Sequence, residues 1–285
     1  MEQQETATRR LLGIKYEPNI EGRELSEIMG FDYPDIPLKA QLTLRNRLFA
    51  YCHANRVNSP DLTWAALSSR FLGLDFLGIY IPQVHTYIVR EDSKPVAYHE
   101  NFHGYVHLRN PRIRQVAIEG LAASFGSILG NPDSGDLIQK AMMTKILDEG
   151  ICQYVGIKAA YSRGDQHSRE SAIRLNNQTL ALSDTTDKGR MDHDMLKALI
   201  GHMHEVEVGL YEKKTGLKAL KQFNDLDKLS PLFYTLGLKF CIDAIKFLQE
   251  QGLTEVEAVN LLIDNPPSKI KHLDDPSEFI KANLS

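Results

Sequence analysis

The chain has 285 residues, of which 42% are hydrophobic and 25% are charged, the proportions of an ordinary globular protein. A chain of this length can bury a large core without disulfides, so we expect a single domain over residues 1–285. The 33 basic and 37 acidic residues give a formal net charge of -4, which argues against nucleic acid as the main partner because phosphate binding needs a basic face.

The cysteines and the first residues bear on the compartment. Cys52, Cys152 and Cys241 are far apart and each lies among apolar neighbours, a pattern that indicates reduced, packed thiols. Residues 1–10 are polar and charged, with no apolar run of signal-peptide length behind them, and no later stretch approaches a membrane-spanning length. We therefore expect a cytoplasmic protein without a membrane partner.

The first 95 residues contain the strands that we expect. Residues 1–37 are polar and interrupted by proline and glycine, which predicts short helices and loops. Periodicity then predicts helices over 38–55 and 59–72. Residues 76–82 and 84–90 are rich in Ile, Val, Tyr and Phe and precede a turn at 91–95, which predicts two strands.

After this turn the hydrophobic periodicity is helical throughout. It predicts helices over 96–108, 112–129, 134–162, 166–182, 192–223, 231–251 and 254–263. The fold class that follows is α+β, mainly α, with a small sheet followed by a large helical body. Within the domain we distinguish a helical and loop region (1–75), a sheet-edge and metal-site core (76–164) and a helical C-terminal subdomain (165–285).

The motif that carries chemistry is His99-Glu100-Asn101-Phe102-His103. Residues four apart on a helix lie one above the other, so His99 and His103 present two imidazoles to one metal ion. Glu100 lies about 100° around the helix from His99 and can reach a water on that ion without being a ligand. His107 stands one turn beyond His103, and we interpret it as a second-shell or packed residue because three ligands along one straight helix span too much length for one ion.

A catalytic zinc site needs a third protein ligand and an open fourth position. Two glutamates compete for that role. Glu119 follows a break at Pro111 that would fold its helix back to the level of His103, and Glu149 follows His103 after 45 intervening residues. The helical neighbours of Glu149 are apolar, and a buried carboxylate is costly unless a cation pairs with it, so we favour Glu149 and keep Glu119 as the alternative.

Together these segments resemble the gluzincin metallopeptidases, the thermolysin and aminopeptidase superfamily. In that family the third ligand is a glutamate often followed by glycine, a hydrophobic residue, a small residue and an aromatic residue, as in Glu149-Gly150-Ile151-Cys152-Gln153-Tyr154. The resemblance covers residues 84–161, with a longer spacing than in the best-known members. It implies a zincin-like fold, a zinc cofactor, and a strand at 84–90 that binds an extended peptide at the sheet edge.

Such a reaction also needs a donor to the developing oxyanion. Tyr234, in Phe233-Tyr234-Thr235-Leu236-Gly237, resembles the tyrosine-x-x-glycine helix that often follows the third ligand in these families, and it is our candidate. His202 and His204 are the second option, of which at most one could enter the site because residues two apart point to different faces of a helix.

The sequence thus predicts a zinc metallopeptidase that acts on peptides or small proteins. His99, His103 and Glu149 bind the metal, Glu100 is the general base and Tyr234 is the oxyanion donor. Two alternatives stay open: a metal-dependent hydrolase of another amide or ester, and a catalytically silent helical interaction protein whose metal is structural, closed by a fourth ligand such as His107 or Glu119.

Overall fold

The computed structural model describes residues 15–34, 38–41, 78–81, 85–89, 93–116, 134–184, 230–267 and 271–284. The predicted helices at 59–72 and 192–223, and with them His202 and His204, lie outside these ranges. Glu119 and Cys52 lie outside them as well.

Four short strands form one sheet in the order β1-β2-β4-β3. Their bounds are Lys15–Glu17 (β1), Leu38–Gln41 (β2), Gly78–Ile81 (β3) and Thr86–Val89 (β4). β2 and β4 are parallel, and the other two pairs are antiparallel. The strands predicted at 76–82 and 84–90 are confirmed as β3 and β4.

Two predictions about this sheet are wrong. Residues 38–41 are strand β2 and not the start of a helix over 38–55, because pairing with β1 and β4 on both sides outweighs the helix propensity of a Leu-Lys-Ala-Gln segment. The predicted edge strand at 84–90 is an interior strand, since β4 lies between β2 and β3. Among the described strands β3 is the edge next to β4, and β1 is the opposite edge.

The described part of the chain is mainly helical, as predicted. The helices are α2 (Ile20–Met29), α5 (Lys94–Arg109), α7 (Ser134–Ser162), α8 (Gln166–Asp184), α11 (Ser230–Glu250), α12 (Glu255–Asp264), α13 (Lys271–Asp274) and α14 (Pro276–Leu284). A short helical segment at 111–116 follows the predicted break at Asn110 and Pro111. No helix in the described ranges is long and apolar enough to cross a membrane.

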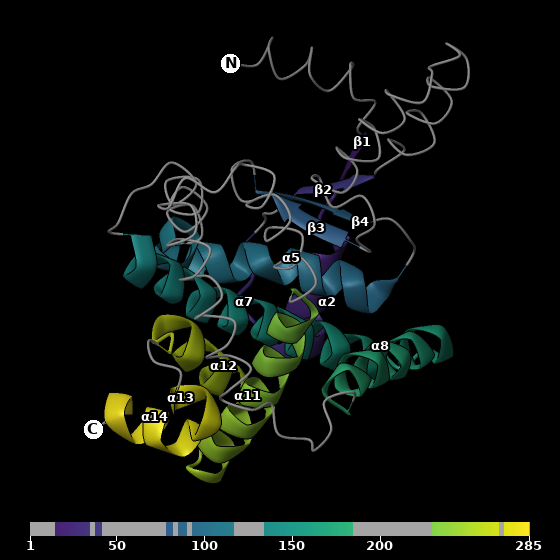
Figure 1. The fold of residues 1–285 in the computed structure, drawn as a ribbon. Helices are drawn as coiled ribbons and strands as arrows, with labels where there is room; N and C mark the ends of the chain where they lie inside the picture. Colours follow the sequence, from purple (N-terminus) through teal and green to yellow (C-terminus); the bar gives the residue numbers. More distant parts are fainter. Residues whose placement is uncertain are drawn as a thin grey trace.

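Helix α5 is the central element of the fold. It packs against β3 and β4 on one side and against α7 on the other, and α7 in turn packs against α8 and α11 (Figure 1). Residues 95–107 of α5 are all buried, as expected of a helix enclosed on all sides. One hydrophobic cluster continues from α5 through α7 and α11 to α12 and α14.

Glycines let the three central helices approach closely. A Cβ at Gly156 on α7 would lie 2.6 Å from the carbonyl oxygen of Pro95 on α5 and 3.1 Å from the Cβ of His99. A Cβ at Gly237 on α11 would lie 2.1 Å from the carbonyl oxygen of Ile146 and 2.6 Å from the Cα of Gly150, both on α7. The backbones of α5, α7 and α11 therefore touch at positions where a side chain does not fit.

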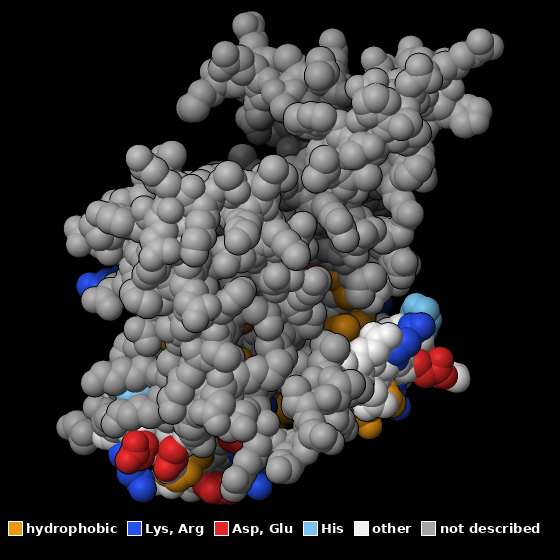
Figure 2. All heavy atoms as spheres, in the orientation of Figure 1, with side chains coloured by type: hydrophobic (Ala, Val, Ile, Leu, Met, Phe, Trp, Pro, Cys, Tyr) orange, Lys and Arg blue, Asp and Glu red, His pale blue; other side chains and the backbone are white. Residues whose placement is uncertain are grey.

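Charges of both signs meet on the described surface. In Figure 2 acidic and basic side chains lie close together along the lower edge of the molecule. This agrees with the nearly balanced composition.

Candidate metal centre

Three atoms from α5 and α7 converge at the centre of the fold. The Nε2 atoms of His99 and His103 are 3.1 Å apart. An oxygen of Glu149, Oε2, lies 3.1 Å from Nε2 of His99 and 3.5 Å from Nε2 of His103. All three side chains are buried, so the two helices bring together the three residues that the sequence proposes as ligands.

The spacing of these atoms fits a metal ion. An ion about 2.0–2.2 Å from each of three tetrahedrally arranged N and O ligands requires ligand atoms about 3.3–3.6 Å apart. The observed separations of 3.1, 3.1 and 3.5 Å are close to that value. The donor set of two imidazoles and one carboxylate is also that of a known class of catalytic zinc sites.

Two further groups of buried residues, which overlap with this one, could hold a metal ion in the described part of the chain. One consists of His99, Glu100 and His103, and the other of His103, His107 and Asp148. In the second group Asp148 oxygens lie 2.9 Å from Nδ1 of His103 and 3.2 Å from Nε2 of His107. These are ordinary hydrogen-bond lengths, so two imidazole N–H groups that donate to Asp148 account for this second group without an ion.

Asp148 orients the ring of His103. Because Nδ1 of His103 donates to Asp148, its Nε2 is the nitrogen directed at His99 and Glu149. A carboxylate behind a ligating imidazole fixes the tautomer and raises the basicity of the ligand. His99 differs, since its Nδ1 is buried without a hydrogen-bond partner among the described residues.

Sequence reasoning missed Asp148 as a functional residue, although it lies within the Glu149 segment. The apolar neighbours that indicated a role for Glu149 also apply to Asp148. A second buried carboxylate in the same stretch needs a partner of its own. That partner is His107, predicted as second-shell or packed, together with His103. The hydrogen bond from His107 to Asp148 fits this interpretation.

Further contacts hold the His103 ring in place. Tyr80 of β3 stacks on it with ring centroids 5.9 Å apart and an interplanar angle of 18°. The hydroxyl of Tyr80 is hydrogen-bonded to Nδ1 of His85 at 2.7 Å. The thiol of Cys152 lies 3.2 Å from Nδ1 of His103. None of these contacts could be inferred from the sequence, since they join separate elements.

The charges around His103 are strongly coupled. Burial by itself would lower the pKa of His103, but Asp148, Cys152 and Glu149 outweigh burial and raise this pKa well above its ordinary value. The pKa of Asp148 is lowered, because His103 and His107 outweigh its burial. In the metal-free protein these groups therefore form an imidazolium–carboxylate pair.

Glu100 lies beside the converging atoms without being the nearest carboxylate. Its Oε1 is 4.0 Å from Nε2 of His99, against 3.1 Å for Glu149. A Cβ at Gly78 of β3 would lie 2.5 Å from Cγ of Glu100, so the strand can approach this side chain only because residue 78 is a glycine. Burial raises the pKa of Glu100, partly offset by His99 and His103, which brings this carboxyl closer to the range useful for a general base.

Lys145 is a cation at the same centre that the sequence interpretation did not include. Its ammonium group is ion-paired with Oε1 of Glu149, one helical turn further along α7. The pKa of Glu149 is well below its ordinary value because Lys145 and His103 outweigh the effect of burial. Glu149 is therefore ionised and able to bind a cation with its other oxygen.

Tyr234 of α11 also reaches the centre. Its ring centroid lies 5.8 Å from that of His99, and the Glu149 carboxylate is the main cause of its raised pKa, followed by burial. The contact between Gly237, one turn after Tyr234, and Gly150, next to Glu149, brings the two helices together here. Because its pKa is raised, the Tyr234 hydroxyl stays protonated over a wide pH range. It can therefore act as a hydrogen-bond donor.

Comparison with protein-family models, with curated proteins and with solved structures finds no match.

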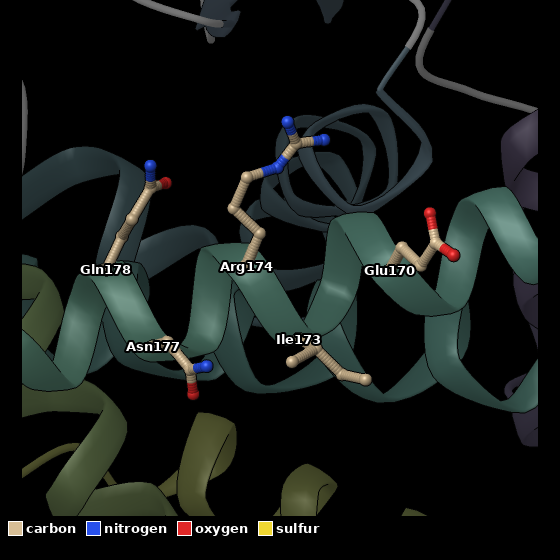
Figure 3. A pocket seen from close by; sticks show the side chains of 5 residues that line it. All are labelled: Glu170, Ile173, Arg174, Asn177 and Gln178. Atoms are coloured by element: carbon tan, nitrogen blue, oxygen red, sulfur yellow. The ribbon is translucent and has the colours of Figure 1, made fainter.

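A hollow also lies on α8. Figure 3 shows its lining, in which Arg174 and Gln178 extend from one side of the helix. The residues that line it are Glu170, Ile173, Arg174, Asn177 and Gln178. None of them belongs to a group that could hold a metal in the described ranges, so the candidate site remains the centre between α5 and α7.

Proposed function

We propose that this chain is a zinc-dependent metallopeptidase of the gluzincin kind, with His99, His103 and Glu149 as the metal ligands. The observation that carries the proposal is the convergence of one atom from each of these residues within 3.5 Å of the other two. Three protein ligands leave a fourth position for water or substrate, which distinguishes catalytic from structural zinc sites.

The surroundings of α5 support a zincin-like fold. The helix that carries the two histidines lies between a small sheet and a helical body, and the third ligand comes from the following long helix. β3, with Gly78 against Glu100, has no second partner strand among the described residues. We propose β3, in place of β4, as the strand that an extended peptide substrate would pair with.

His99, His103 and Glu149 would hold the zinc ion, which would supply polarisation of the scissile carbonyl and a more acidic water. In the proposed reaction Glu100 accepts a proton from the attacking water at a carboxylate oxygen while the water oxygen adds to the carbonyl carbon, and Glu100 then donates this proton to the amine nitrogen as the C–N bond breaks. The hydroxyl of Tyr234 donates a hydrogen bond to the oxygen that becomes negatively charged. Asp148 keeps the proton of His103 on Nδ1, so that Nε2 remains a lone-pair donor.

We further propose a reducing compartment, the cytoplasm. Cys152 and Cys241 are buried and free in the structure. Burial raises the pKa of both thiols, which keeps them protonated and unreactive.

Replacement of Glu100 tests the catalytic part of the proposal. Zinc-loaded wild-type protein should cleave members of a quenched-fluorescence peptide library, and Glu100→Gln should reduce kcat by at least about a hundredfold while one equivalent of zinc stays bound. Glu257→Gln, which changes a glutamate that caps α12 through Thr254, is the matched control and should behave as wild type.

Three outcomes would contradict the proposal. Loss of zinc from Glu100→Gln would make Glu100 a ligand and not the base. A zinc protein that cleaves esters or non-peptide amides and no peptide would favour the alternative hydrolase. Tightly bound zinc with no hydrolysis of any of these substrates would favour a structural site.

A further inference from the structure

We propose that Lys145 recognises a free carboxylate on the substrate, on the residue next to the bond that is cleaved. This inference rests on the proposed function, because it concerns the substrate class of the same centre. It would make the enzyme one that removes a terminal residue or hydrolyses N-acyl amino acids.

Lys145 lies directly behind the candidate ligand Glu149. The Glu149 carboxylate is shared, with Oε2 directed at His99 and His103 and Oε1 ion-paired with Lys145. A single carboxylate group therefore separates the ammonium from the position where the ligand atoms converge. Of the ion pairs formed by lysine or arginine in the described ranges, this is the one that includes a candidate ligand.

The Lys145 side chain is partly open to solvent. The side chain of Lys145 is 48% exposed, whereas that of Glu149 is 5% exposed. The Lys145 side chain therefore lies between solvent and the buried centre. An ammonium group has three N–H donors. Among the described residues Glu149 is the acceptor that pairs with Lys145, so N–H donors remain for a substrate anion.

A purely structural role explains Lys145 in the metal-free protein only. There its ammonium group compensates the charge of the buried Glu149 carboxylate. Once an ion binds Glu149, that ion compensates the buried carboxylate, and a neighbouring ammonium then repels the ion. A cation kept in such a place is expected to have another partner in the working state.

The distances select the kind of anion. In a bound substrate the scissile carbonyl would lie at the metal position. A substrate carboxylate that contacts Lys145 at the same time must be close to that carbonyl, because Lys145 is next to the metal position. One residue spans at most about 3.6 Å, so the carboxylate belongs to the residue adjacent to the scissile bond. A hydrogen bond to a charged group contributes enough for roughly a tenfold preference of carboxylate over carboxamide.

The test uses a matched pair of probes, N-benzoyl-leucine and N-benzoyl-leucine amide, whose binding to the zinc-loaded full chain is measured by calorimetry. All proteins compared, wild type at residue 145 included, carry Glu100→Gln, so that the probes bind without being cleaved. Wild type should bind the carboxylate about tenfold more tightly. Lys145→Met should lose this preference, and Lys145→Arg should keep most of it. Lys158→Met is the control, since Lys158 lies on the same helix, is 40% exposed and pairs with Glu255 away from the centre.

Zinc affinity and folding complete the design. Zinc should bind Lys145→Met at least as tightly as wild type, and the thermal unfolding of both variants should stay cooperative. A preference that survives in Lys145→Met would mean that the carboxylate binds the metal itself, and zinc binding weakened tenfold or more would mean that Lys145 only positions Glu149. Either result overturns the inference.

The failures of the two proposals are distinguishable. If wild type binds zinc and cleaves peptides without any preference for a free carboxylate, the role of Lys145 is overturned and the proposed function stands. If wild type binds no zinc, both are overturned together.

Discussion

At the scale of single residues, the centre is organised by pairs of acidic and basic groups that each have a distinct task. Asp148 and Glu149 are neighbours on α7, yet one turns to the Nδ1 side of His103 and the other to its Nε2 side. This follows from the rotation of about 100° between successive helical residues. Two adjacent carboxylates can therefore serve as ligand and ligand support around one imidazole.

Replacement of Asp148 tests its supporting role. Asp148→Asn keeps the shape but removes the charge that holds the Nδ1 proton of His103, so we expect zinc affinity to fall by about 10- to 100-fold. Competition with a chromophoric chelator measures this change. Asp264→Asn, at the exposed pair with Arg109, should leave the affinity unaltered, and an equal loss in both variants would contradict a specific role.

The coupled charges predict how the stability of the metal-free protein depends on pH. The raised pKa of His103 gives a contribution that is complete below its ordinary pKa, about 6.5, and that is lost as the pH rises through the folded value. The raised pKa of Glu100 acts in the same direction. The lowered pKa values of Asp148 and Glu149 give contributions that are present above about pH 4 and are lost in acid.

We therefore expect the free energy of unfolding of chelator-treated protein to decrease between about pH 6 and pH 9. Urea denaturation at several pH values measures it. His103→Gln should be less stable at pH 6 and should show a flatter dependence over this range. An increase in wild-type stability from pH 6 to pH 9 would contradict the arrangement of charges described above.

The sequence predicts the candidate ligands better than their surroundings. His99, His103 and Glu100 follow from spacing on one helix, and Glu149 follows from an apolar neighbourhood that requires a cation. The roles of Asp148, Lys145 and Tyr80 depend on side chains meeting across separate elements. Neither periodicity nor composition contains that information.

At the scale of elements, contacts at glycine determine where the helices meet. Gly237 and Gly150 form the contact of α11 with α7, and Gly156 forms that of α7 with α5. The sequence predicts the bounds of α7 at 134–162 because a long helix-forming stretch lies between clear breaks on both sides. It fails for β2, since four residues without strong strand character become a strand only through pairing with distant partners.

Gly237→Ala tests the contact between α7 and α11. The added Cβ would lie 2.1 Å from the carbonyl oxygen of Ile146, so backbone must move, at a cost of about 1–3 kcal/mol or more. This should exceed the gain of about 1 kcal/mol in helix propensity. We expect a net loss in the free energy of unfolding by urea denaturation, together with a lower kcat because Tyr234 shifts.

Lys239→Ala, at an exposed position of α11, is the control for this substitution and should change stability by less than about 0.5 kcal/mol. A Gly237→Ala protein as stable as wild type would show that the close contact is not a requirement of the fold.

At the scale of the whole molecule, the described helices share one hydrophobic cluster, and the candidate centre lies where α5, α7 and α11 come together. A metal ion bound there would connect residues 99 and 149, and so add a link between two helices that already pack against each other. The expectation of a single domain over 1–285 stays a prediction. The mainly helical character of the described chain is confirmed.

Anomalous X-ray scattering at the zinc edge, from crystals of the zinc-loaded full chain, locates the bound metal and its ligands. We expect one strong peak, about 2.0–2.2 Å from Nε2 of His99, Nε2 of His103 and Oε2 of Glu149. A peak between His103, His107 and Asp148, or no peak in protein crystallised with excess zinc, would contradict this expectation.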